Sequence, residues 1–185
     1  MTKIIDISIP VNEGMVVWSG SLKPHFKQVL SFKKGDSWTE TEINMDLHTG
    51  THIDGPLHRI RGGASVDKLR LEAMVGPAFV AYLPKAKTIT PEILDNLNLP
   101  KGTSRLLFKT SNSKLWAKQN TGFQKKFVAL TVNGAEWLVD HKIKLIGNDY
   151  LSVGQFSEDG RVQAEVHRIL LEKGIALLEG LNLSG

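Results

Sequence analysis

The sequence of 185 residues contains no cysteine, which excludes disulfide bonds, thiolate zinc sites and cysteine nucleophiles. A metal ion would therefore have to be bound by histidine and carboxylate side chains. Long apolar runs are also missing, because no stretch approaches the ~18 residues of a membrane-spanning helix. Asp6 interrupts the N-terminal segment where a signal peptide needs an unbroken apolar run. We therefore expect a cytoplasmic protein with no membrane partner.

A concentrated basic region is absent as well. The 23 Lys and Arg residues outnumber the 19 Asp and Glu residues by four, but the longest basic runs are the pairs Lys33-Lys34 and Lys125-Lys126. Nucleic-acid-binding domains usually carry a basic stripe interleaved with aromatic residues, so we expect no nucleic-acid partner. The length and the ordinary balance of 41% hydrophobic and 23% charged residues predict a single domain over residues 1–185.

Short apolar segments alternate with helical segments along the chain. Periodicity predicts extended segments at residues 3–9, 26–32, 39–47, 79–83, 105–109, 127–132, 143–146 and 175–178. Helices are predicted at residues 91–97, 135–140 and 162–173, with Thr90 and Asn133 as N-caps and Gly174 as the last stop signal. This alternation predicts an α/β or α+β fold with mixed sheets.

Three of the six histidines and one aspartate fall within eleven residues, in the segment His48-Thr-Gly-Thr-His-Ile-Asp-Gly-Pro-Leu-His58. An isolated histidine is more often a hydrogen-bonded core or surface residue, which is our interpretation of His25 and His141. A cluster of this density instead indicates metal binding or catalysis.

The residues between these histidines are poor helix formers, so we expect an extended chain. Side chains then alternate, and His48, His52, Asp54 and His58 all point to one side. A straight strand would hold His48 about 13 Å from His52. Glycine within a strand commonly marks a bulge or kink, and we therefore predict a bend at Gly50 that brings His48 toward the ion.

Two histidines and one carboxylate suit a borderline divalent ion such as zinc and leave a coordination position for water. His58 lies beyond the predicted end of the strand, so it is either a further ligand or, as we favour, a proton carrier. Far along the chain, His167 lies at the border of an apolar helix stripe, facing either solvent or a pocket. Glu179 lies on a buried-type strand, where a carboxylate is costly unless it is paired, metal-bound or at the exposed strand end. Together the two segments offer enough ligands for two ions.

These residues carry a resemblance to a known family. The sequence resembles the metal-dependent cyclase-type hydrolases that include bacterial kynurenine formamidase. The matching segments are Asp6-Ile-Ser-Ile-Pro10, Gly14-Met-Val-Val-Trp18, the whole histidine segment, Gly62-Gly63, Val75-Gly-Pro77, Lys109-Thr-Ser-Asn-Ser-Lys114, Leu145-Ile-Gly-Asn-Asp-Tyr-Leu-Ser-Val153 and the stretch from His167 to Leu181.

The resemblance implies a two-metal site, usually with Zn²⁺ and sometimes with Mn²⁺. It implies that His48, His52 and Asp54 bind one ion, and that His167 and Glu179 bind the second ion with Asp54. It further implies that His58 is the proton carrier and that Trp18 lines the substrate pocket. The implied fold is a compact α/β domain with mixed β-sheets in a barrel-like core and flanking helices, of the swivelling β/β/α type. Family members are similar in forming homodimers or higher homo-oligomers.

The hypothesis from the sequence is a hydrolase acting on a small carboxamide or formamide, in which metal-activated water attacks the carbonyl and His58 serves as acid and base. One alternative is the opening of a cyclic amide or imide, such as an isatin-like compound. Another is a protein that binds a metal or a small molecule without turning it over.

Overall fold

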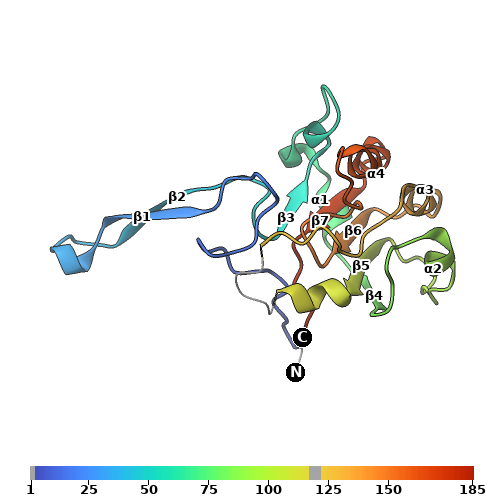
Figure 1. Ribbon diagram of the computed structural model, residues 1–185, viewed down its shortest axis with the longest axis horizontal. Coiled ribbons are helices and arrows are strands. Elements are labelled where there is room, and N and C mark those ends of the chain that lie inside the picture. The colour runs from blue at the N-terminus through green and yellow to red at the C-terminus, as the bar shows by residue number, and fades with distance from the viewer. Residues whose placement is uncertain (1–2, 117–121) are drawn as a thin grey trace.

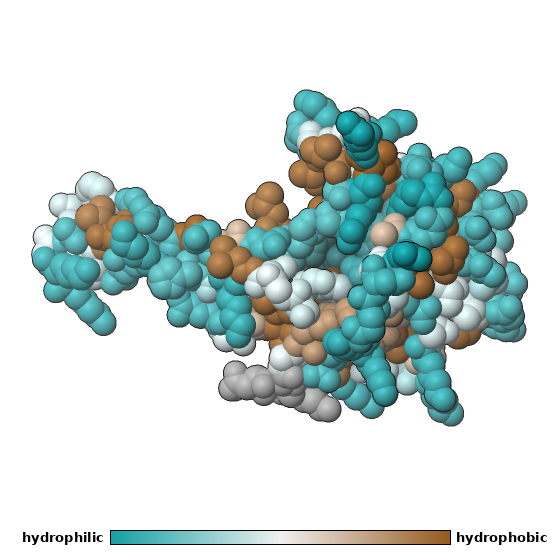
Figure 2. All heavy atoms as spheres, turned by 45° about the horizontal axis from the view of Figure 1, so that its top comes forward, coloured by the Kyte–Doolittle hydropathy of each residue, from teal (hydrophilic) through white to brown (hydrophobic). Residues whose placement is uncertain are grey.

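The computed structural model describes residues 3–116 and 122–185, and its most conspicuous feature is a projecting arm (Figure 1). Strands β1 (His25–Leu30) and β2 (Glu40–Asn44) pair antiparallel to form it. Phe32 and Trp38, in the connection between these strands, are 67% and 56% exposed. Hydrophobic side chains accordingly lie among hydrophilic ones toward the far end of the arm (Figure 2).

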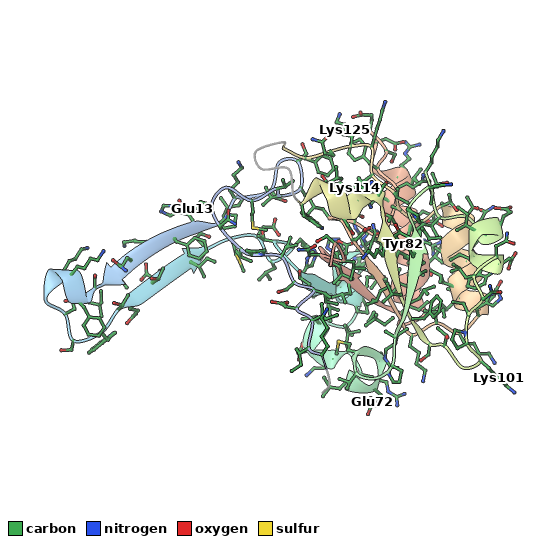
Figure 3. All side chains as sticks on the ribbon, turned by 90° about the horizontal axis from the view of Figure 1, so that it is seen from below. Glu13, Glu72, Tyr82, Lys101, Lys114 and Lys125 are labelled. Carbon is green, nitrogen blue, oxygen red and sulfur yellow. The ribbon has the colours of Figure 1, made fainter. Side chains whose placement is uncertain are left out.

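The base of the arm is tied to the preceding loop through Glu13 (Figure 3). The Glu13 carboxylate accepts a hydrogen bond of 3.0 Å from the Phe26 backbone N–H, and its Oε1 lies 3.0 Å from Nδ1 of His25. Both side chains of the His25–Glu13 pair are exposed. The pair therefore belongs to the surface, which is one of the two ordinary positions that the sequence left open for His25.

A five-stranded mixed sheet forms the centre of the body. Its members are β3 (His52–Asp54), β4 (Phe79–Leu83), β5 (Arg105–Thr110), β6 (Leu145–Asn148) and β7 (Ala176–Glu179), in the spatial order β3-β7-β6-β5-β4. Strands β4 to β7 run parallel, whereas β3 pairs antiparallel with β7. The mixed α/β class is confirmed. The sheet is open, with β3 and β4 at its edges, rather than closed into a barrel.

Three of the four α-helices in the described part of the chain cover one face of this sheet (Figure 1). The α-helices are α1 (Leu71–Met74), α2 (Pro91–Asp95), α3 (Val132–Asp140) and α4 (Arg161–Glu172), and 3-10 turns occupy Phe32–Lys34, Pro56–His58, Val66–Lys68 and Ser111–Leu115. The helix side buries residues such as Phe108, Ile146 and Leu177 beneath α2, α3 and α4. The opposite side buries alternate strand residues such as Leu107 and Leu145 against Leu181 and Leu183.

Helix α4 follows directly from its sequence. Val166, Leu170 and Leu171 recur at helical spacing and are buried in the core. Gly174, which follows the helix, has a φ of +70°, a left-handed conformation that glycine adopts without steric cost. The helix therefore presents one face to the sheet, and His167 lies on that buried face with 1% exposure.

Three predictions of secondary structure are wrong. Residues 3–9 do not form a strand. Their described backbone hydrogen bonds join Ser8 N–H to the Asp6 carboxylate, Ile9 N–H to the Thr51 hydroxyl, and Asn182 N–H to the Ile7 carbonyl, so no ladder forms. Residues 127–132 contribute only isolated bridges at Leu130. Helix α3 begins earlier than predicted because Thr131, rather than Asn133, caps it by accepting a hydrogen bond from Gly134 N–H.

Among the helices of residues 3–116 and 122–185, none has the length and apolar character needed to cross a membrane. The cytoplasmic location stays a prediction of the sequence.

Candidate metal centre

The candidate site lies where β3, β7 and α4 meet on the helix side of the sheet. His52 pairs directly across the β3–β7 ladder from Glu179, and Asp54 pairs across from Leu177. Since side chains alternate along a strand, His52, Asp54 and Glu179 share the face that Leu177 turns toward α4. His167 approaches from that helix. Four side chains from two distant parts of the sequence therefore converge on one point.

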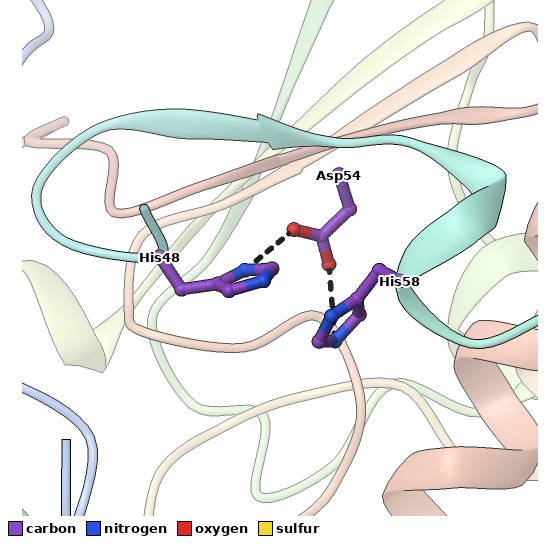
Figure 4. Close-up of side chains that lie close together, drawn as sticks. All are labelled: His48, Asp54 and His58. Atoms are coloured by element: carbon purple, nitrogen blue, oxygen red, sulfur yellow. Dashed lines mark ion pairs between the residues drawn. The ribbon is translucent and has the colours of Figure 1, made fainter. Parts of the chain in front are cut away.

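Asp54 occupies the centre of this arrangement and is only 1% exposed. Its Oδ1 lies 2.9 Å from Nδ1 of His48 and 3.4 Å from Nε2 of His52. Its Oδ2 lies 3.6 Å from Nε2 of His167 and 3.9 Å from Nε2 of His58. Figure 4 shows His48 and His58 on either side of this carboxylate.

Two backbone carbonyls orient the buried histidines. Nδ1 of His52 lies 3.1 Å from the Gly50 carbonyl, and Nδ1 of His167 lies 2.8 Å from the Gln163 carbonyl. A ring whose Nδ1–H donates to a carbonyl presents Nε2 to the site, and this is the usual support for a metal-binding histidine. The sequence left open which way His167 faces, and the structure places its ring inside.

Glu179 is likewise held in position, with 3% exposure. Its Oε1 accepts a hydrogen bond of 2.8 Å from Val153 N–H and lies 3.1 Å from Nε2 of His167. Its Oε2 lies 3.7 Å from Nε2 of His52. The exposed strand end that the sequence allowed for Glu179 is therefore excluded.

The predicted bend at Gly50 is confirmed, with a φ of +78°. His48 precedes the bend, and its backbone N–H donates to the Asp46 carboxylate at 2.8 Å. Regular pairing starts only at His52, so His48 reaches the site from a turn rather than from the same strand. The bend leaves Nδ1 of His48 at 3.1 Å from Nε2 of His52.

The pKa values of these groups reflect both their burial and the charged groups around them. Burial raises the pKa of Asp54, but contacts with His48, His52 and the other histidines outweigh it and leave the pKa below its ordinary value. Burial lowers the pKa of both His52 and His167, yet the neighbouring carboxylates reverse the shift and raise it. The lowered pKa of Asp54 and the raised pKa values of His52 and His167 share one cause, because neighbours of opposite charge stabilise each charged form. A metal ion would compete with protons for these histidine nitrogens.

His58 differs from the other three histidines of the cluster. Its distance of 3.9 Å to Asp54 is the longest of the four, and its side chain is 26% exposed, compared with 37% for His48. Burial, followed by repulsion from His48 and neighbouring cations, lowers its pKa to about 4 despite the opposing effect of Asp54. Its ring centroid lies 4.1 Å from that of His48. His58 and His48 therefore both lie on the accessible side of the cluster, and His58 is the one farther from Asp54.

The donor atoms fit a divalent cation. Both oxygens of Asp54 are buried and accept no well-aligned hydrogen bond, although four histidine nitrogens lie within 4 Å. Neutral ring nitrogens as close as those of His48 and His52 repel each other unless a proton or a cation lies between them. Nitrogen and carboxylate oxygen are common ligands of zinc.

The side chains form two overlapping groups with donor atoms within 4.8 Å of one another: His48, Asp54 and His58 in one, and His52, Asp54 and Glu179 in the other. Asp54 belongs to both, as the sequence predicted for a shared carboxylate. The grouping differs from the predicted division, because His52 lies with Glu179 and His58 lies with His48. The assignment of ligands to particular ions stays a prediction.

Trp18 is not among the residues that converge on Asp54. It lies in an aromatic cluster, with ring centroids at 4.5 Å from Phe123, 6.0 Å from Phe156 and 6.4 Å from Phe127. Tyr150 completes this cluster, and its backbone carbonyl accepts a hydrogen bond from Gly180 N–H, next to Glu179. The cluster thus adjoins the loop behind the site, and the predicted substrate-binding role of Trp18 stays a prediction.

Thr51 is the residue that sequence reasoning missed. It lies within the histidine motif, but its partners, Ile9 and Gly180, are far away in sequence. Its position between predicted ligands was the available signal.

A buried carboxylate shared by two groups of histidine and carboxylate donors suits a divalent cation. The family model described as "Putative cyclase" matches residues 5–155. The chain belongs to this cyclase family.

Relatives match almost the whole chain. Cyclase-like protein 1 of Arabidopsis thaliana is 34% identical over 192 residues, which cover 99% of this chain and 74% of that protein. A kynurenine formamidase of Bacillus cereus is 33% identical over 181 residues, covering 97% of this chain and 82% of that enzyme.

Solved structures agree with this family membership. A structure described as a potential metal-dependent hydrolase with cyclase activity is 31% identical, with a TM-score of 0.81 and coverage of 98% of this chain and 82% of that chain. Isatin hydrolase A of Labrenzia aggregata shares the fold with a TM-score of 0.79, covering 98% of this chain and 82% of that chain, at 21% identity.

Proposed function

We propose that this chain is a metal-dependent hydrolase of small carboxamides or formamides. The observation that carries the proposal is the buried Asp54 carboxylate, which has no aligned hydrogen bond and is faced by four histidine nitrogens. The name of the Bacillus relative, kynurenine formamidase, favours a formamide. The name of the Labrenzia structure, isatin hydrolase, favours the second candidate, a cyclic amide or imide.

The proposed ligands are His48, His52, Asp54, His167 and Glu179, holding two Zn²⁺ per chain with Mn²⁺ as the alternative metal. A bound ion of this kind supplies Lewis acidity and an activated water at neutral pH. The chain itself contributes the fixed orientation of His52 and His167 through the Gly50 and Gln163 carbonyls. It also supplies the burial that keeps other water from Asp54.

His58 is the proposed acid and base, because it is the most loosely placed histidine around Asp54 and its ring is partly open to solvent. Its imidazole takes the proton from the attacking water as the new C–O bond forms. It then returns this proton to the nitrogen as the C–N bond breaks, so the products are a carboxylic acid and an amine. A neutral imidazole is the form that accepts the first proton.

A substrate panel tests the reaction class. Purified protein, supplemented separately with Zn²⁺ and Mn²⁺, is assayed with formanilides, formylkynurenine and cyclic amides. We expect hydrolysis of at least one class and no hydrolysis after chelation. If no substrate of the panel is hydrolysed with either metal, the result contradicts the proposed hydrolase activity and favours a protein that binds metal without turnover.

We also propose that two copies of the chain associate as a homodimer. The arm supports this, because a two-stranded hairpin without a core is marginally stable alone. The Phe26–Ile43 pair on one face of the arm is 37% and 48% exposed, in addition to Phe32 and Trp38 near its end. Exposed aromatic anchors of this kind are typical of association surfaces. Sedimentation velocity over a concentration series tests it, and a monomer throughout contradicts it.

A further inference from the structure

The hydroxyl of Thr51 joins three separate segments of the chain. Its Oγ1 accepts a hydrogen bond of 2.9 Å from Ile9 N–H and donates one of 2.5 Å to the Gly180 carbonyl. Ile9 belongs to the N-terminal segment, Thr51 precedes β3, and Gly180 follows β7. One side chain thus fixes three backbones that local sequence does not connect.

The bond between Thr51 and Gly180 lies one residue away from two proposed ligands. Thr51 directly precedes His52, and Gly180 directly follows Glu179. The two strands that carry these ligands pair over only three residue pairs. The register that sets the His52–Glu179 distance therefore depends strongly on contacts just outside the ladder.

The two backbones approach so closely at this point that no side chain fits between them. A Cβ on Gly180 would collide with the Gly50 carbonyl, and Gly180 has a φ of +71°. Strand alternation turns the Thr51 side chain away from the face that holds His52 and Asp54. Thr51 can therefore affect a bound ion only through the backbones that it holds.

We propose that Thr51 is a positioning residue for the metal centre, whose hydroxyl sets the separation of His52 and Glu179. The inference rests on the proposed metal-binding function. Residues that hold metal ligands from outside the coordination sphere typically change metal affinity by ~10–100-fold when replaced. We expect a loss in that range when the Thr51 hydroxyl is removed.

The test is Thr51→Val, which keeps the branched shape and removes the hydroxyl. The metal-free variant is titrated with Zn²⁺ against a chelating indicator, and with Co²⁺ while the visible absorption bands that report ligand geometry are recorded. We expect about 10–100-fold weaker Zn²⁺ binding and altered Co²⁺ bands. Thr51→Ser retains the hydroxyl and should show the Zn²⁺ affinity and the Co²⁺ bands of the wild type. Thr51→Ala serves if Thr51→Val does not fold.

The chain offers a matched control in Thr131. Its hydroxyl also accepts one backbone hydrogen bond, from Gly134 N–H, and donates one, to the Ile89 carbonyl, at the start of α3 rather than beside the ligand strands. Thr131→Val should lower thermal stability without changing Zn²⁺ affinity or the Co²⁺ bands. Equal Zn²⁺ affinity in Thr51→Val and the wild type would overturn the positioning role. A wild-type chain that binds neither metal would instead overturn the proposed function.

Discussion

His52 and Glu179 face each other across the β3–β7 ladder, with Nε2 of the first 3.7 Å from Oε2 of the second. The pair joins a proposed ligand from the histidine motif to one near the other end of the chain. Asp54, two residues from His52, shares the same face and contacts His167 as well. The strand pairing therefore assembles the site, and the motif alone does not complete it.

Replacing Asp54 by Asn should abolish metal binding, because Asp54 is the one residue common to both ligand groups. Without metal, we expect the variant to be only modestly less stable than the wild type, because it loses the contacts of the carboxylate with His48 and His52. At metal concentrations of ~100 times Kd, binding should stabilise the wild type by about 2.7 kcal/mol and leave the variant unchanged. Elemental analysis and urea unfolding with and without Zn²⁺ measure this. Unchanged Zn²⁺ content and unchanged stabilisation by Zn²⁺ in the variant would contradict the role of Asp54 as a shared ligand.

Replacing His58 by Asn should leave the metal content intact and lower turnover by about 100-fold or more, because a positioned acid–base group typically contributes 10²–10⁴-fold. Elemental analysis is paired with kcat on the best substrate of the panel. His48 is the matched comparison, since it contacts the same carboxylate at 2.9 Å. His48→Asn should lose metal. Loss of metal in His58→Asn would make His58 a ligand, in line with its grouping with His48 and Asp54.

The sequence predicted those parts of the fold and site that depend on neighbouring residues. The strand Phe79–Leu83, helix α4 and the bend at Gly50 all follow from local periodicity and glycine chemistry, and the structure confirms them. The clustering of His48, His52 and Asp54 was visible because these residues are adjacent in sequence.

Features that depend on distant partners could not be predicted in the same way. Residues 3–9 alternate like a strand, but alternation does not supply a neighbouring strand. His167 lies at the border of its helix stripe, and only the packing of α4 against β7 decides that it is buried. The partners of Thr51 are 42 and 129 residues away, so the sequence shows its position between predicted ligands but not its hydrogen bonds.

Replacing Phe32 and Trp38 together by Ser should weaken self-association. Loss of aromatic anchors at an interface typically costs at least ~2 kcal/mol, which corresponds to about a 30-fold higher dimer Kd. Sedimentation velocity gives the Kd, and circular dichroism checks that the body remains folded. Ile4→Ser removes a 93% exposed apolar side chain elsewhere and should leave the Kd unchanged. Equal association of the arm variant and the wild type would exclude the arm from the interface.

Replacing Gly180 by Ala should be far more damaging than replacing Gly174 by Ala. Both glycines have nearly the same left-handed conformation, with φ of +71° and +70°. The conformational cost of alanine, about 1–2 kcal/mol, is therefore common to both. At Gly174 the new Cβ meets no atom within 4 Å, whereas at Gly180 it collides with the Gly50 carbonyl.

The backbone at Gly180 cannot move without shifting Glu179 or the Gly50 bend that supports His52. In urea unfolding, we expect Gly174→Ala to lower the unfolding free energy only by the conformational cost. Its Zn²⁺ affinity should be unchanged. Gly180→Ala should lower the unfolding free energy by more than about 4 kcal/mol, a range that marks core overpacking and backbone strain. Any folded fraction of this variant should bind Zn²⁺ weakly. Equal effects of the two substitutions would mean that the crossing of Gly50 and Gly180 is looser than the structure shows, and that the ligand strands are held by their ladder alone.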